Sequence, residues 1–245
     1  MKDDVKLKEK LRSICVEEMT KATTSGVFNG IPARLKAFQE DPTWPHFGFD
    51  SQEFLQYQAV GNFYTAIFRK VGDLFEGVIQ EIVFHKLGIP FEEQKHSFEI
   101  VVDGVVQHRS LDVAIDTKKI GDKAKRIAVE SALVELTRDK KPASTVIEIR
   151  GCYMIGDSKR INADEHAAIA ARDANLSPVM LVFCSTSLSS PTKRLRRTWN
   201  FFEGNESYNF VEKVTGFDLQ GFFSEISPDL KRVTEDLLAV FQRNA

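Results

Sequence analysis

Residues 144–155 read S-T-V-I-E-I-R-G-C-Y-M-I. β-Branched and apolar residues alternate through this stretch, which is the pattern of a buried strand. Because side chains alternate faces along a strand, Glu148 and Arg150 project from one side while Ile147 and Ile149 project from the other. Burying a charge costs several kcal/mol unless the charge is paired or holds a metal. The charged side of this strand therefore predicts a compensating partner elsewhere in the chain.

The overall composition is that of a globular protein. The chain has 245 residues, a net charge of −2 and 42% hydrophobic residues. This is enough for one large domain spanning 1–245 with a sizeable core. A net charge so close to zero excludes a protein whose whole surface attracts nucleic acid, so any polyanion site depends on local clustering.

The cysteines and the N-terminus indicate the cellular compartment. The chain has three cysteines, Cys15, Cys152 and Cys184, and two of them lie in apolar strand-like runs. An odd number of cysteines in such positions favours reduced structural thiols over disulfides. The first ten residues, M-K-D-D-V-K-L-K-E-K, lack the apolar region of a signal peptide. No run approaches the roughly 18 apolar residues of a membrane span. We therefore expect a cytoplasmic protein with no membrane contact.

Ahead of the 144–155 strand, the chain predicts several helices and a hairpin. Helices are expected at 3–21, at 33–39, and from a cap at Asp50 or Ser51 to Leu87, with an interruption at Gly61. The Asp103-Gly104 pair, whose residues both tolerate positive φ, then predicts a hairpin between strands at 97–102 and 105–116. On the second strand, one face carries Leu111, Val113 and Ile115, and the other carries Asp112, Ala114 and Asp116.

Beyond that strand, alternating helices and strands define the fold class. A helix at 128–137 precedes the 144–155 strand, and an alanine-rich helix capped by Asn162 or Asp164 follows that strand. A further apolar strand is expected at 178–184. A strand, helix, strand crossover implies a parallel pair of strands with the helix on one face. We therefore predict an α/β fold with a central mixed sheet flanked by helices. Further helices are expected at 216–226 and 228–242.

Two carboxylates are expected to meet in this sheet. If the second hairpin strand neighbours the 144–155 strand, Asp112 and Glu148 converge, with Arg150 beside them. Such a pair is a hard oxygen site suited to Mg²⁺, which takes one or two carboxylates and fills its other positions with water and phosphate oxygens. An ion held there can lower the pKa of an attacking water and stabilise a leaving oxygen, so the pair predicts hydrolytic chemistry.

At this point the sequence resembles the PD-(D/E)xK nuclease superfamily, and within it the type II restriction endonucleases. The resemblance covers about 71–185 and rests on G-D-L-F-E-G-V, on S-L-D-V-A-I, on V-I-E-I-R and on the helix and strand that follow. It implies a restriction-endonuclease-like core at about 62–185, with a helical part at 1–61 and a DNA-contacting, helical part at 186–245. It also implies Mg²⁺ bound by Asp112 and Glu148, joined by Glu76 from the preceding helix. The expected assembly is a homodimer that cuts double-stranded DNA at a short palindrome.

The sequence departs from the family pattern in two ways. Arg150 stands where the family has lysine, and arginine cannot release a proton at pH 7, so it can orient water or stabilise the phosphorane but cannot act as the general base. Lys118 or Lys159 could replace the missing lysine. Asp112 and Glu148 are 36 positions apart, so the lysine-rich insertion between them must be looped out.

Other basic residues are candidates for contacts with DNA. A cluster beside Trp199 suits phosphate or base-edge contacts, and two residues before the alanine-rich helix suit phosphate contacts at its N-terminus. The candidates are Lys118, Lys159, Arg160, Lys193, Arg194, Arg196, Arg197 and Asn200. The candidate residues also have plainer interpretations. The basic cluster could be a solvated loop, and Glu148 with Arg150 could be a surface ion pair. Asp116, on the same face as Asp112, competes with it for the metal role.

The expected function is thus that of a type II restriction endonuclease, a Mg²⁺-dependent hydrolase of DNA phosphodiester bonds. One alternative keeps the fold but makes the protein a structure-specific or repair nuclease. Another is a non-catalytic DNA-binding protein, in which Arg150 marks a lost active site.

Overall fold

The structure is a computed structural model that describes residues 2–23, 31–102, 105–139, 144–153, 158–187 and 189–244. Its internal contacts divide the chain into two units, each described by itself. Unit 1 is Met1–Arg12 with Phe75–Glu225, and unit 2 is Ser13–Leu74 with Ile226–Ala245. The expected core at 62–185 therefore does not coincide with a unit, because unit 1 continues well past residue 185.

Three long helices have residue ranges that extend from one unit into the other: α1 (Lys2–Thr23), α3 (Gln52–Leu87) and α9 (Leu219–Asn244). The cap of α3 is Ser51, whose hydroxyl accepts a 3.1 Å hydrogen bond from the Phe54 N–H. The expected interruption at Gly61 is wrong, because α3 is continuous over 36 residues. A helical glycine costs only about 1 kcal/mol relative to alanine, too little to end a helix of this length.

The strands of unit 1 form two sheets. The antiparallel pair β1 (His96–Val102) and β2 (Val105–Leu111) stands alone, and the Asp103-Gly104 turn lies outside the described residues. The second sheet has the order β3-β4-β5-β6, in which β3 is antiparallel to β4 and the other pairs are parallel. Its strands are β3 (Val113–Ile115), β4 (Thr145–Arg150), β5 (Ser177–Val182) and β6 (Asn200–Glu203). This confirms an α/β fold with a mixed central sheet.

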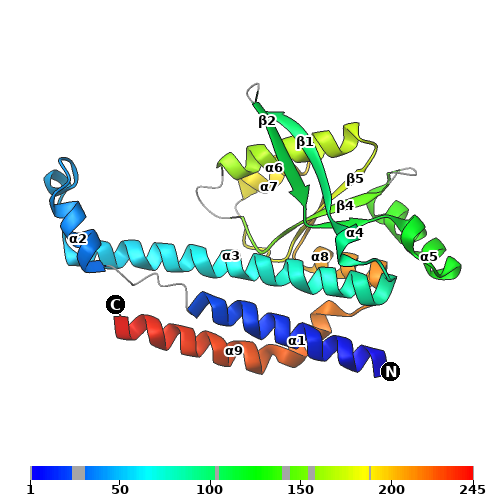
Figure 1. Ribbon diagram of the computed structural model, residues 1–245, viewed down its shortest axis with the longest axis horizontal. Helices are drawn as coiled ribbons and strands as arrows, with labels where there is room; N and C mark the ends of the chain where they lie inside the picture. The colour runs from blue at the N-terminus through cyan, green and yellow to red at the C-terminus, as the bar shows by residue number, and fades with distance from the viewer. Residues whose placement is uncertain are drawn as a thin grey trace. The chain divides into compact units, whose positions relative to one another are not determined.

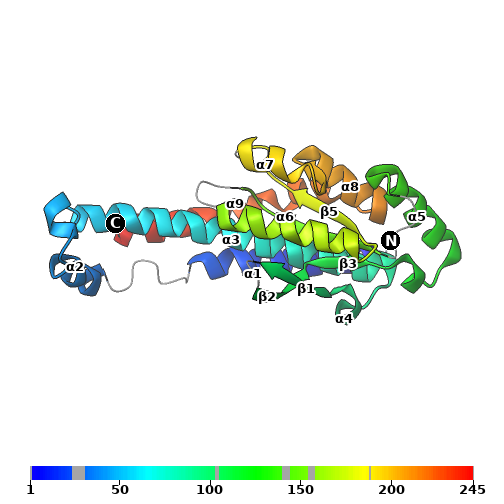
Figure 2. The ribbon, with the colours of Figure 1, turned by 90° about the horizontal axis from the view of Figure 1, so that it is seen from above.

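Helices cover both faces of this sheet (Figures 1 and 2). The helices of unit 1 not yet named are α4 (Phe91–Gln94), the 3₁₀ turn η2 (Thr117–Lys119), α5 (Lys123–Thr137), α6 (Ser158–Asp173), α7 (Ser189–Leu195) and α8 (Asn205–Thr215). On one face, Val146 and Met180 pack in a core cluster with the alanines of α6. On the other, Phe183 stacks on Phe75 of α3, with ring centroids 3.9 Å apart, and meets Tyr208 of α8.

The expected strand at 105–116 is in fact two strands that belong to different sheets, β2 and β3, with Asp112 between them. The break changes the alternation of side chains. Leu111 and Ala114 belong to the same core cluster, although an unbroken strand would place them on opposite faces. Asp112 therefore occupies a bend rather than a strand interior.

The C-terminal third differs most from the sequence prediction. The segment at 193–200, expected to contact DNA, runs from the end of α7 to the start of β6, and α8 was not predicted. The two expected terminal helices are a single helix, α9, with Pro228 inside it. Asn162 and Asp164 do not cap α6, because that helix already begins at Ser158.

The expectation of three unpaired cysteines is also wrong. Cys152 and Cys184 form a disulfide with their Cα atoms 5.4 Å apart, and only Cys15 is free among the three. The parallel register pairs Arg150 with Val182, so the residues two positions further on lie opposite one another. The presence of reduced thiols therefore no longer supports the expectation of a cytoplasmic protein.

Unit 2 contains α2 (Ile31–Gln39) and the 3₁₀ turn η1 (Trp44–Phe47), besides its parts of α1, α3 and α9. Within the described ranges, no helix combines the length and the apolar character that a membrane crossing requires.

Candidate functional site

Asp112 is held in place from two directions. Its carboxylate Oδ2 accepts a 2.7 Å hydrogen bond from the Ile149 N–H of β4. Its backbone carbonyl accepts a 3.0 Å hydrogen bond from the side chain of Gln80 on α3. Because Val113 pairs with Ile147 in the antiparallel register, Asp112 lies beside Glu148. The structure therefore brings the two predicted carboxylates to neighbouring positions on adjacent strands.

Arg150 lies between two acids beneath α6. Its Nη2 contacts the Glu148 carboxylate and lies 3.1 Å from Oδ1 of Asp164, a residue of α6. Glu148 is 6% exposed and Asp164 is 4% exposed. The compensating partner that the strand's charges required is therefore an acid on the covering helix together with the charges of the strand itself.

Asp164 is fixed by two further bonds. Its Oδ2 accepts a 2.6 Å hydrogen bond from the Tyr153 hydroxyl, and its backbone carbonyl accepts one of 3.0 Å from the Trp199 indole. Sequence reasoning missed Asp164 and Tyr153 as site residues. A signal was present, because Asp164 has helical spacing to Ala168 and Ala171 and so shares the buried face of α6.

Two acids of this cluster, Glu148 and Asp112, are held toward their neutral forms. Burial raises the pKa of Glu148 to about 8, the charge of Arg150 opposes the shift, and Asp112 and Asp164 add to it. Burial also raises the pKa of Asp112, against the opposing effects of Arg150 and the Ile149 N–H. Burial outweighs the ion pair between Arg150 and Glu148, although that contact alone would lower the pKa of the acid. The Glu148 carboxyl therefore carries less than its full negative charge near pH 7.

Arg150 itself remains a cation. Burial would lower its pKa, but Glu148 and Asp164 raise the pKa well above the ordinary arginine value. Its Nε is buried and has no hydrogen-bond partner within the described ranges. Such an orphaned donor in a charged cluster is suited to an acceptor from outside the protein, such as water or a phosphate oxygen.

The donor set limits what metal the cluster could hold. The residues that the structure describes contain no group of three or more His, Cys, Asp or Glu side chains placed to hold an ion. Glu76, the expected third ligand, accepts a 3.0 Å hydrogen bond from Gln80 and is not joined to Asp112 and Glu148 in such a group. Two hard carboxylates fit Mg²⁺, which completes its shell with water and substrate oxygens.

Lys118, Lys159 and Arg160, the other basic candidates near the expected site, lie in different parts of unit 1. Lys118 is on η2, beside a cavity of about 880 Å³ that Thr145 also lines, so it lies near the end of β4 opposite Arg150. Lys159 lies in the first turn of α6, and its side chain is outside the described residues. Arg160 is exposed, and its charge lowers the pKa of both Asp112 and Glu148. Arg160 is thus the predicted DNA contact that the structure places near the acids.

The basic cluster at 193–197, which begins in α7 and extends beyond it, is partly neutralised inside the protein. Arg194 pairs with Glu165 of α6, and Arg196 lies 3.1 Å from Glu203 with its guanidinium 4.6 Å from the centre of the Phe201 ring. Lys193 and Arg197 are exposed, and neither has an ion-pair partner among the residues described.

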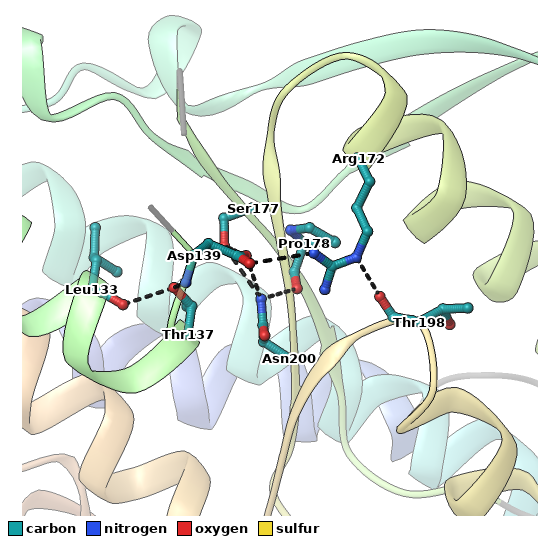
Figure 3. Close-up of polar contacts among 8 residues, drawn as sticks. All are labelled: Leu133, Thr137, Asp139, Arg172, Ser177, Pro178, Thr198 and Asn200. Carbon is teal, nitrogen blue, oxygen red and sulfur yellow. Dashed lines mark hydrogen bonds and ion pairs between the residues drawn. The ribbon is translucent and has the colours of Figure 1, made fainter. Parts of the chain in front are cut away.

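Asn200 has a structural role at the other end of the sheet (Figure 3). Its amide donates to Asp139 Oδ2 at 2.9 Å and to the Pro178 carbonyl at 3.1 Å. Ser177 and Arg172 also donate to Asp139, at 2.5 and 3.4 Å. Burial would raise the pKa of Asp139, but these partners together hold it below the usual value. The amide of Asn200 is thus already occupied, which does not favour its expected contact with DNA.

Comparisons of the chain with protein-family models, with curated proteins and with solved structures found no match. The fold and site thus define a class no finer than an α/β protein with a buried, mixed-charge cluster at its central sheet.

Proposed function

We propose that this protein is a Mg²⁺-dependent endonuclease that cuts double-stranded DNA as a homodimer, in the manner of type II restriction endonucleases. The observation that carries the proposal is the hydrogen bond from Ile149 to the Asp112 carboxylate, which places this acid beside Glu148. Arg150 follows two positions later on the same face of the strand. The order of acid, acid and cation resembles that of the sequence motif, with arginine in the place of its lysine.

The proposed roles follow from the chemistry of each side chain. Asp112 and Glu148 would hold the ion, which supplies an activated water and stabilises the leaving oxygen. Arg150 is a permanent cation, so it would bind the scissile phosphate and stabilise its growing negative charge rather than remove a proton. Its orphaned Nε–H is suited to this contact.

Binding of the ion is expected to release protons. The pKa of Glu148 is raised to about 8, and a carboxylic acid must lose its proton before it binds a metal. Affinity for Mg²⁺ should therefore increase as the pH rises toward 8. Arg160 beside the acids, and the exposed side chains of Lys193 and Arg197 elsewhere in the chain, are suited to phosphate contacts that position DNA without reading its sequence.

Digestion of supercoiled plasmid tests this proposal. Incubation with Mg²⁺ should yield discrete fragments with mappable ends, and EDTA should prevent their formation. Cleavage that follows DNA shape and gives no fixed ladder would instead indicate a structure-specific or repair nuclease. Absence of cleavage with every divalent ion tried would overturn the proposal.

One observation favours a second candidate, a non-catalytic DNA-binding protein. Arg150 already contacts both Glu148 and Asp164, so it supplies the positive charge that a metal would otherwise provide. An arginine locked in that position would act as a structural counter-ion. This candidate predicts binding of DNA that does not require Mg²⁺ and produces no cleavage.

A further inference from the structure

The disulfide between Cys152 and Cys184 joins the carboxyl ends of β4 and β5. These strands are parallel, and the last backbone hydrogen bond between them in the described chain runs from the Cys184 N–H to the Gly151 carbonyl, at 2.9 Å. In open α/β sheets, ligands bind outside the carboxyl ends of the parallel strands. The disulfide therefore lies at the edge of the sheet where Arg150 is held between its two acids.

A reductant in solution can reach this disulfide. Both cysteines are half-buried, and Thr186 beside them is exposed. Thr186 Oγ1 lies 3.5 Å from Cys152 Sγ, and Ser187 Oγ lies 3.4 Å from Cys184 Sγ. A hydroxyl that donates to a thiolate favours its charged form, and a thiolate is what leaves when a disulfide is reduced. Exposed disulfides are the labile and regulatory ones, so these surroundings suit a disulfide that opens and closes.

Tyr153 connects the disulfide to the charged cluster. This residue follows Cys152 directly, and its N–H donates to Ser187 Oγ at 3.0 Å. The same Ser187 oxygen lies within 3.8 Å of both sulfurs. The Tyr153 hydroxyl donates to Asp164 Oδ2 at 2.6 Å, and the other oxygen of that carboxylate lies 3.1 Å from Nη2 of Arg150. One chain of contacts thus leads from the sulfurs through Tyr153 and Asp164 to Arg150.

The position of Tyr153 depends on the disulfide. Beyond Gly151, the described polar contacts of this stretch are the disulfide, the Tyr153 N–H bond to Ser187 and the bonds of the Tyr153 hydroxyl. When a disulfide opens, its sulfurs separate from bonding distance to van der Waals contact. This separation displaces Ser187, whose oxygen lies against both sulfurs. Two of the ties therefore change together, and only the buried ring and its hydroxyl remain to hold Tyr153 in place.

We propose that the Cys152–Cys184 disulfide is a redox-sensitive switch for the charged cluster. A dithiol reductant supplies two electrons and two protons: the sulfur–sulfur bond breaks, each cysteine becomes a thiol, and the dithiol becomes a disulfide. Tyr153 then moves away from Asp164, whose carboxylate is no longer held against Arg150. Oxidation restores the contacts. The cluster is complete only in the oxidised protein, whatever reaction it serves, so the proposal does not rest on the nuclease activity.

Trp199 reports on this change. Its indole donates to the Asp164 backbone carbonyl at 3.0 Å and is buried. The chain has two tryptophans, so Trp44→Phe leaves Trp199 as the single fluorophore of this kind. Reduction of this variant with dithiothreitol should shift the emission to longer wavelength. The shift should occur at the ratio of reduced to oxidised dithiothreitol at which two thiols per chain appear in addition to Cys15.

Tyr153→Phe in the same background is the matched variant, because it keeps the ring and removes the hydroxyl that reaches Asp164. Its disulfide should form and open as before, but the emission of Trp199 should no longer respond. Cys15→Ala should leave the response unchanged, because this free thiol lies in unit 2.

Hydrogen exchange of the Tyr153 amide, followed by mass spectrometry, gives a second measurement that needs no substitution. The N–H of Tyr153 donates to Ser187 in the oxidised protein. Its exchange rate should rise about tenfold on reduction, which is the change expected on the loss of one hydrogen bond.

An emission and an exchange rate that stay constant while the thiols form would overturn the proposal, as would a full response in Tyr153→Phe. No release of thiols by dithiothreitol would also overturn it. Loss of the far-ultraviolet circular dichroism of the whole chain on reduction would show a structural staple instead of a switch. Because neither DNA nor a metal ion is added, failure here and failure of the nuclease proposal are separate results.

Discussion

The Asp112 carboxylate accepts a 2.7 Å hydrogen bond from the backbone N–H of Ile149. This contact joins the bend between β2 and β3 to the central strand, across 37 positions of sequence. Because the donor is a backbone group of β4, the position of Asp112 does not depend on the ion pairs of Arg150. The two carboxylates are therefore brought together by the fold itself.

The raised pKa of Glu148 predicts a pH dependence of stability. The unfolded pKa is near 4.5 and the folded pKa is about 8, so the folded state holds the extra proton between these values. The free energy of unfolding should fall as pH rises through this window, by at most about 1.4 kcal/mol per pH unit. Glu148→Gln should flatten the slope in urea unfolding between pH 5 and about 8, and an equal slope in both proteins would contradict the assignment.

Replacement of Arg150 separates the two candidate functions. Arg150→Lys keeps a cation between Glu148 and Asp164, so the fold should survive with a loss of about 1–2 kcal/mol. If the protein is a nuclease, both forms should cleave plasmid with Mg²⁺. If Arg150 has displaced the metal, only the lysine variant should cleave, because lysine can lose its proton and leave Glu148 free. The measurement is the initial cleavage rate, with the melting temperature as the control for folding.

Much of the fold and half of the site could be predicted from the sequence. The apolar runs of β4 and β5 and the periodicity of α3 identified those elements, and side-chain alternation placed Glu148 and Arg150 on one face of β4. The bend at Asp112 could not be predicted, because it depends on a change of sheet rather than on local preference. Likewise, the basic residues at 193–197 favoured a solvated loop, so the short strand β6 that follows them was not predicted.

The partners of the charged residues and of the cysteines could not be predicted. They depend on how strands pair and how helices pack over them, which the sequence alone does not reveal. Asp164 is a partner of Arg150 only because α6 packs over β4, and Cys152 reaches Cys184 only because β4 and β5 pair as they do. Asn200, expected at DNA, is the first residue of β6 and donates to Asp139 instead.

The Asp139 network should contribute to stability rather than function. Asp139 accepts hydrogen bonds from Ser177, Asn200 and Arg172 (Figure 3). Asp139→Leu leaves these donors without an acceptor, so we expect a loss of about 2–4 kcal/mol in urea unfolding. Binding of DNA should be unchanged in the fraction that remains folded. A loss of DNA binding without a loss of stability would show that this end of the sheet contacts the ligand.

The disulfide should stabilise the ends of β4 and β5. The linked residues are separated by 32 positions, and a loop of that length predicts a stabilisation of about 4 kcal/mol. The double change Cys152→Ser with Cys184→Ser should lower the free energy of unfolding by that amount, and dithiothreitol should lower the free energy of unfolding of the unchanged protein equally. If dithiothreitol has no effect on the unchanged protein, the thiols are not paired in solution.

Binding of Mn²⁺, measured by electron paramagnetic resonance, tests most directly whether Asp112 and Glu148 form a metal site. Mn²⁺ prefers the same oxygen ligands as Mg²⁺. We predict one site per chain, whose affinity rises between pH 6 and about 8 and which Asp112→Asn or Glu148→Gln abolishes. Asp116→Asn is the matched control, because the Asp116 side chain accepts from the Lys118 N–H and should leave binding intact. Absence of the site in the unchanged protein, or its survival in both variants, would contradict the account.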